Sequence, residues 1–182
     1  DGPFRYDAWM KGLAAGRSFV TTGPMLLADF DGKPPGHRFE WRGSPARRVR
    51  VNVKLISEQP VKAIEILRNG DVISQLAPKS KQNGDGAFEA DLGESVTIQG
   101  TSWLAVRCWE ERPGGRMRFA HTAPVWFDAP DAPLRPRKRE VEWLLQRTRD
   151  EIARSEALLP PEALAEYREA LAAYEALARD AQ

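Results

Sequence analysis

Strict alternation of apolar and polar residues marks the middle of the chain. Every second residue from Val49 to Leu55 is apolar, and the residues between them are charged or polar. This period of two is typical of a strand with one buried face and one solvated face. The alternation returns between Phe88 and Leu92, and Ser102–Trp109 is almost wholly apolar, as expected of a central strand covered on both faces. The middle of the chain is therefore predicted to be rich in short strands.

Turn residues separate these predicted strands. Val61–Arg68 and Asp71–Leu76 flank Asn69-Gly70, which is the strongest short hairpin signal because both turn residues tolerate positive φ. One more strand is expected at Thr122–Asp128. Six to nine short strands with turns between them predict an antiparallel β-sandwich of the immunoglobulin-like type, with a barrel as the alternative.

The two ends of the chain carry helical patterns instead. A helix is expected from Asp7 to Ala15, with Asp7 as its N-cap and Gly16 placed to end it. Near the other end, apolar residues at three-four spacing, interrupted by Pro160-Pro161, predict a helical hairpin. The pattern divides the chain into a helix and strand over 1–24, a β-sandwich over 25–128, a linker over 129–136 and a helical hairpin over 137–182.

Net charge, apolar run length and cysteine content limit the kinds of partner and site that the chain supports. The net charge is +1, which gives no support for nucleic acid or an anionic membrane as a partner. No apolar stretch approaches the ~20 residues of a membrane span. Cys108 is the only cysteine and lies in an apolar run, so we expect a buried, unreactive thiol. The compartment stays open, because any export signal would lie upstream of Asp1.

Few residues could carry chemistry on their own. A metal site needs several His, Cys or carboxylate ligands at one point. The histidines, His37 and His121, lie far apart in the sequence, and no motif of paired ligands is present. Asp29 and Asp31 would face one side of a strand, where solvated carboxylates are a simpler interpretation than a metal site. We therefore predict no catalytic residue, metal or other cofactor in this chain.

Tryptophan offers a second kind of site, because a flat aromatic face can stack on a sugar ring. Trp41, Trp109 and Trp126 fall in or near predicted strands and are the candidates for ligand stacking. Core filling is the competing interpretation, since tryptophan has a large apolar surface and one N–H to satisfy.

Several stretches, taken in order, resemble a known enzyme family. The first runs from Tyr6 through Leu13, with a Trp and a Leu on a helix, and continues as Gly16–Leu26, a Gly-Arg pair followed by a Thr-x-Gly-Pro strand exit. The last is Ala120–Val125, which reads Ala-His-Thr-Ala-Pro-Val. Between them the matching stretches are Asp31-Gly32-Lys33 with Pro35-Gly36, Ile64–Gly70 and Ser102–Arg107. Together they resemble a region late in the PHP-superfamily metallohydrolases of the carbaryl-hydrolase-like (CehA/McbA) group.

That resemblance implies a non-catalytic accessory role. The family's catalytic portion is a distorted β/α barrel, which holds divalent metals through residues upstream of the matched region, so no ligand is carried over. Residues 1–24 would be the last helix and strand of that barrel, and the remainder a C-terminal accessory region. The Zn, Mn or Fe ions would belong to the upstream catalytic domain, which is the expected partner. The accessory region would brace the barrel, shape its active-site mouth or mediate homodimer contacts.

The resemblance also points to an active-site rim in the intact protein, formed by His121, Thr21, Thr22 and Arg17. The two threonines end a strand, on the side where α/β barrels keep their sites. His121 has two interpretations: contact with substrate or a metal-bound water, or a structural hydrogen bond that fixes the strand into Pro124. The alternative function is a stand-alone β-sandwich binding module for carbohydrate or protein, and a small enzyme of unrecognised type is a third.

Overall fold

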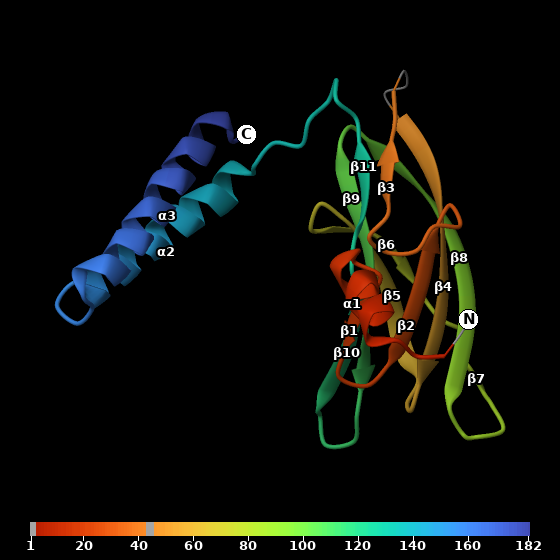
Figure 1. The fold of residues 1–182 in the computed structure, drawn as a ribbon. Helices are drawn as coiled ribbons and strands as arrows, with labels where there is room; N and C mark the ends of the chain where they lie inside the picture. Colours follow the sequence, from red (N-terminus) through yellow and green to blue (C-terminus); the bar gives the residue numbers. More distant parts are fainter. Residues whose placement is uncertain (1–2, 43–45) are drawn as a thin grey trace. The chain divides into compact units, whose positions relative to one another are not determined.

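The computed structural model describes residues 3–42 and 46–182 (Figure 1). The chain divides into two compact units, Asp1–Pro133 and Leu134–Gln182. The first unit is mainly β and begins with one short helix, and the second consists of two helices. The prediction of a mainly β fold with a short N-terminal helix and C-terminal helices is confirmed.

The smaller sheet of the β unit has four strands, in the order β2 (Met25–Phe30), β4 (Ala46–Ser57), β8 (Phe88–Gln99) and β7 (Lys81–Gln82), and its pairs are antiparallel. The alternation predicted for β4 is confirmed, because Val49, Val51, Val53 and Leu55 are buried and Arg50 and Lys54 are exposed.

The larger sheet has seven strands. They are β1 (Phe19–Thr21), β10 (Met117–Thr122), β9 (Ser102–Glu111), β11 (Val125–Asp128) and β3 (Arg38–Glu40), with β5 (Val61–Arg68) and β6 (Asp71–Leu76). β9 is central, since β5 pairs along one edge while β10 and β11 share the other. The expectation that this strand is covered on both faces is wrong near its end, where Trp109 is 42% exposed.

One hydrophobic core takes side chains from both sheets. Inward-facing residues of β4 lie in the same cluster as Ile64 and Ile66 of β5 and Leu104 and Val106 of β9. Burying an aliphatic side chain of this size stabilises a fold by roughly 1.5–3 kcal/mol. The core therefore supplies the main force that holds the β unit together.

The Asn69-Gly70 hairpin forms between β5 and β6 as predicted. Both residues have positive φ, 52° and 92°, as a two-residue turn of the favoured hand requires. Asn69 also ties the turn to β9, because its Oδ1 accepts a hydrogen bond from the Trp103 N–H at 2.9 Å.

Two expectations about the last strands are wrong. The single strand expected at Thr122–Asp128 is broken at Ala123-Pro124 into β10 and β11. Pro124 has no N–H to donate, and Ala123 N–H donates to Ser18 O instead (2.9 Å). The β unit is also not wholly antiparallel, since β11 pairs in parallel with β3.

The N-terminal helix α1 (Tyr6–Ala14) begins before the expected residue. Its N-cap is Arg5, whereas Asp7 lies in the first turn and forms an ion pair with Arg5 at 3.0 Å. The predicted end is confirmed, because Gly16 follows the helix with a φ of 70°. Position 16 thus uses the freedom of glycine at positive φ to turn the chain into β1.

The helical unit contains α2 (Lys138–Ser155) and α3 (Pro161–Asp180). Pro160 precedes α3, so the predicted break is confirmed. Val141, Leu145 and Leu164 are its buried apolar side chains. Among the residues described, no helix is long and apolar enough to span a membrane. Residues 129–132, expected in the linker, are fastened to the β unit, since Ala129 and Ala132 are hydrogen-bonded to Thr101.

Candidate functional site

The first 27 residues carry an unusual amount of exposed apolar surface. Eight large hydrophobic side chains are exposed there, namely Phe4, Tyr6, Trp9, Met10, Leu13, Val20, Met25 and Leu27. In the remaining described residues of the β unit only Val72, Trp109 and Met117 join them. Apolar surface gathered in one segment is typical of a contact with another protein surface.

Half of these eight side chains lie on helix α1, and we call the set the N-terminal apolar surface. Tyr6, Trp9, Met10 and Leu13 have the spacing i, i+3, i+4 and i+7, so they share one side of the helix. None of the residues of α1 is buried. An apolar stripe of this kind normally faces a core, and here it is open.

Three of the stretches that resemble the metallohydrolase family meet where α1 ends. A Cβ placed on Gly16 would lie 2.9 Å from Gly36 Cα, so the two backbones are in close contact. Gly36 N–H donates to Pro124 O at 2.8 Å, and Ala123 N–H donates to Ser18 O at 2.9 Å. The segments around residues 16–18, 36 and 123–124 thus form one junction at the end of the helix.

The other two stretches belong to the same sheet. Ile64–Gly70 covers most of β5 and its turn, and Ser102–Arg107 lies in β9 beside it. β9 in turn pairs with β10, and β10 pairs with β1. Four of the five stretches therefore have residues on neighbouring strands of the seven-stranded sheet or at its margin, whereas Asp31-Gly32-Lys33 follows β2 of the four-stranded sheet.

An apolar hollow of about 250 Å³ opens beside the junction. Its lining includes Arg17, Phe19, Leu26, Leu27 and Pro34. Arg17, one of the residues expected at an active-site rim, thus lies next to Leu27 of the N-terminal apolar surface. This hollow could receive one apolar side chain of a docked partner.

Thr21 and Thr22, also expected at that rim, use their hydroxyl groups within the turn from β1 to β2. Thr21 Oγ1 donates to Pro24 O at 2.5 Å and accepts from Gly23 N–H at 2.9 Å. Thr22 Oγ1 accepts from Phe119 N–H at 2.9 Å. In this chain the two side chains therefore shape the turn and tie it to β10.

His121 lies on β10 and is partly buried. Its Nδ1 is 2.7 Å from Thr122 O. Because a carbonyl oxygen only accepts, Nδ1 carries a proton in this contact. In the neutral imidazole the lone pair then lies on Nε2, which can accept a hydrogen bond.

A polar row crosses four adjacent strands of the seven-stranded sheet and begins at His121. In register order it is His121, Arg107, Glu65 and Gln75, and the apolar Val20 lies opposite His121 on β1. Arg107 Nε and Glu65 Oε2 form an ion pair at 2.6 Å, and Gln75 Nε2 is 3.5 Å from Glu65 Oε1. The positive charge of Arg107 is therefore largely balanced by Glu65, and His121 lies at the end of this row.

The three tryptophan candidates lie in different settings. Trp41 is 8% exposed and belongs to the core, so the core-filling interpretation applies to it. The guanidinium of Arg38 covers Trp126 at 5.2 Å from the ring centre. Trp109 is more open and has Phe119 beside it, with ring centres 5.7 Å apart. Trp109 alone of the three presents an exposed ring.

A buried carboxylate lies near the hairpin that joins β9 and β10. Glu110 is fully buried, and its Oε1 pairs with Arg112 at 3.1 Å. Among the residues described, its Oε2 has no hydrogen-bond partner. Arg112 also donates to Glu58 at 2.7 Å and, chiefly through that hydrogen bond, lowers the pKa of Glu58. Arg112 therefore joins the β4–β5 connection to the end of β9.

The candidate metal ligands and the single thiol lie apart in the described part of the chain. It holds no group of three or more His, Cys, Asp or Glu residues placed to bind a metal ion. Asp29 accepts hydrogen bonds from Asn52, and Asp31 pairs with Arg47 at 2.9 Å. Burial raises the pKa of the Cys108 thiol to about 11, which confirms the predicted buried thiol and keeps it protonated near neutral pH.

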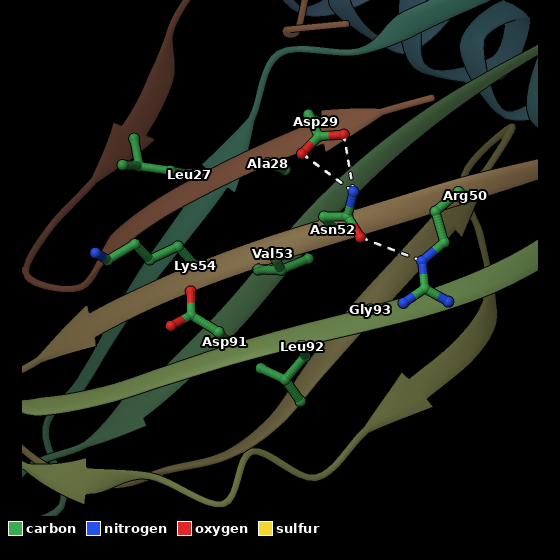
Figure 2. Close-up of a pocket in the computed structure, with 10 residues that line it drawn as sticks. All are labelled: Leu27, Ala28, Asp29, Arg50, Asn52, Val53, Lys54, Asp91, Leu92 and Gly93. Carbon is green, nitrogen blue, oxygen red and sulfur yellow. Dashed lines mark hydrogen bonds between the residues drawn. The ribbon is translucent and has the colours of Figure 1, made fainter. Parts of the chain in front are cut away.

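A second, polar hollow of about 470 Å³ lies on the outer face of the four-stranded sheet (Figure 2). Its charged and amide side chains come from β2 and β4, with one from β8: Asp29, Arg50, Asn52, Lys54 and Asp91. We call it the Arg50 hollow. Sequence reasoning did not single it out, although a glycine inside an alternating strand, Gly93, is a signal that another group approaches closely.

No protein-family model matches the chain, and a search of the curated proteins gives no match. The geometry of the chain and its short matching stretches are therefore the basis for assigning a function.

Proposed function

We propose that this chain is a non-catalytic accessory region of a PHP-type metal-dependent hydrolase and that it docks on the catalytic barrel of the same protein. The single observation that carries the proposal is the N-terminal apolar surface, half of whose side chains lie on α1. Exposed apolar surface is costly in water. A neighbouring domain that covers this stripe would remove that cost.

The junction at the end of α1 supports the same proposal. Gly16, Gly36 and Pro124 fasten the helix end to the β unit. A helix that is anchored at one end and open along its side presents its apolar stripe in a defined position. Docking on α1 would thus set the orientation of the β unit relative to the barrel.

In this proposal the rim residues lie close to the docked domain. Arg17 lies shortly after the end of α1. Thr21 is on β1, opposite Ala120 of β10, and His121 is the next residue of β10. The available Nε2 of His121 would then accept a hydrogen bond from substrate or from a group of the barrel. The resemblance implies that the divalent ions would be held by the catalytic domain. In this chain the carboxylates Asp29 and Asp31 have protein partners. No catalytic step is assigned to these residues.

We also propose that the two sheets form a sandwich of the immunoglobulin-like type. The shared core and the alternation of buried and exposed residues along β4 support this finer assignment. The parallel pair of β11 and β3 departs from an all-antiparallel arrangement.

A binding module is the second candidate, and the exposed ring of Trp109 favours it. Phe119 lies beside that ring, and the Arg107 guanidinium lies over it at 5.7 Å from its centre. A sugar stacked on Trp109 would change the tryptophan fluorescence on titration with glycans, and Trp109→Ala would abolish the change. An unchanged signal across a broad glycan panel would remove the carbohydrate version.

Two observations test the leading proposal. The coding sequence upstream of Asp1 should continue in frame through several clustered His and Asp residues, whereas a start codon at that point would contradict the proposal. The purified chain should show no hydrolysis of phosphate or carboxylate esters on addition of Mn²⁺ or Zn²⁺. Turnover that rises in proportion to added metal would overturn the non-catalytic assignment.

A further inference from the structure

The Arg50 hollow forms where one residue of a cross-strand row lacks a side chain. Asp29, Asn52 and Gly93 are opposite one another on β2, β4 and β8. A Cβ on Gly93 would lie 2.0 Å from Nη2 of Arg50 and 2.7 Å from its Cζ. The guanidinium of Arg50 therefore lies against β8 in space that only a glycine leaves open.

Hydrogen bonds along the sheet hold Arg50 in this position (Figure 2). Its Nε donates to Asn52 Oδ1 at 3.2 Å, and Asn52 Nδ2 donates to Asp29 Oδ1 at 3.0 Å. The same Asp29 oxygen accepts the Gly32 N–H at 2.9 Å. Linked hydrogen bonds of this kind reinforce one another, so the guanidinium is oriented before any ligand arrives.

The charges that remain in the hollow favour an anion. Among the described residues, no carboxylate lies within ion-pair distance of Arg50 or Lys54, which share the outer face of β4. Asp29 is already engaged by Asn52 and Gly32. Asp91, opposite Lys54, is the only other carboxylate in the lining. Within the described lining of the hollow, Arg50 thus has no carboxylate partner, and the one uncommitted carboxylate lies opposite Lys54.

We propose that the Arg50 hollow binds a small molecule through an anionic group, a carboxylate or a phosphate, held by the guanidinium of Arg50. A guanidinium presents two parallel N–H groups that match the oxygens of either anion. The Lys54 ammonium lies at the other end of the hollow (Figure 2) and adds a more distant positive charge. Leu27, opposite Lys54 and partly exposed, offers an apolar neighbour for the rest of the ligand. The proposal does not depend on the docking of a catalytic domain.

Titration of the whole chain with inorganic phosphate and, separately, with acetate tests this site by NMR. We expect saturable shifts of the Gly93 amide and the Arg50 Nε–H, with a Kd of about 1–10 mM, as suits one guanidinium contact at an open surface. The stronger of the two responses identifies the preferred anion. Absence of saturable shifts with both anions would overturn the proposal.

Four variants test which residues of the hollow bind the anion. Arg50→Gln should weaken binding at least about tenfold. Arg48→Gln is the matched control, because Arg48 lies on the same face of β4, opposite Thr97, and outside the hollow. It should leave binding unchanged. Gly93→Ala should weaken binding while retaining every charge, because the new Cβ displaces the guanidinium.

Asp91→Asn completes the set by testing the sign of the ligand's charge. Removal of this carboxylate should tighten anion binding about two- to threefold, the size expected for one nearby charge across water. Equal losses in Arg48→Gln and Arg50→Gln would show unspecific attraction and would overturn the proposal. So would weaker binding in Asp91→Asn, or full affinity in Gly93→Ala.

Discussion

Replacement of Gly36 by alanine should destabilise the β unit much more than the same change at Gly32. Both glycines have positive φ, 84° and 74°, so alanine carries a similar strain at each, roughly 1–2 kcal/mol. They differ in surroundings. A Cβ on Gly36 would lie 1.8 Å from Ala15 O and 2.8 Å from Ala15 C, whereas a Cβ on Gly32 meets nothing within 4 Å.

The difference between the two variants measures the junction itself. Non-bonded atoms settle near ~3.5 Å, so the backbone around Ala15 must move by more than about 1 Å to admit the Gly36 Cβ. That movement strains the hydrogen bond from Gly36 N–H to Pro124 O, which is worth about 1 kcal/mol. We expect a loss of about 1 kcal/mol for Gly32→Ala and about 3 kcal/mol for Gly36→Ala.

Urea unfolding followed by tryptophan fluorescence is the appropriate assay. Five of the six tryptophans lie in the β unit, so fluorescence follows mainly that unit. Far-ultraviolet circular dichroism follows mainly α2 and α3 and serves as an internal control. Equal losses in the two variants, within about 0.5 kcal/mol, would refute the reasoning, since the helix end would then not be fastened to residue 36.

Three further outcomes concern buried and paired side chains. Arg112→Met should destabilise the β unit by about 3 kcal/mol in urea unfolding, because it leaves the buried Glu110 carboxylate unpaired. Adding Glu110→Gln to the same chain should recover much of that loss. Absence of recovery would contradict the assigned pairing of Arg112 with Glu110. Arg112→Met should also raise the pKa of Glu58 toward its ordinary value in an NMR titration. Because Glu58 has a lowered pKa in the folded chain, its contribution to stability is present above its unfolded pKa and is lost as pH falls through its folded pKa. An unchanged Glu58 pKa in the variant would count against the hydrogen bond between Arg112 and Glu58. Cys108 should resist a thiol reagent near neutral pH until the β unit unfolds, and rapid labelling of the folded chain would show that the thiol is accessible.

Local patterns predicted the parts of the fold that depend on neighbouring residues. The alternation from Val49 to Leu55 states which face of β4 is buried, and Asn69-Gly70 places the turn between β5 and β6. Both signals lie within a few residues. They therefore do not depend on how distant segments pack.

Long-range contacts account for the features that the sequence did not reveal. The break at Ala123 follows from a hydrogen bond to Ser18, and the parallel pairing of β3 with β11 joins Arg38 to Asp128, 90 positions apart. The Arg50 hollow depends likewise on Gly93, a residue of another strand. A local sequence pattern does not predict which strands become neighbours in a sheet.

The candidate rim residues show the same limit. Thr21 and His121 were singled out through matching stretches, and the structure places them on adjacent strands. Their hydrogen-bond partners, Pro24 and Thr122, are close in sequence, yet no local pattern indicated that these hydroxyl and imidazole groups are engaged.

Hydrogen–deuterium exchange of α1 tests the docking proposal most directly. The backbone amides of residues 6–14 are compared in this chain alone and in the protein that includes its preceding domain, with α3 as the reference segment. Fast exchange is expected in the isolated chain, with clear protection in the longer protein. Equally fast exchange in both would show that nothing covers the N-terminal apolar surface and would contradict the docking proposal.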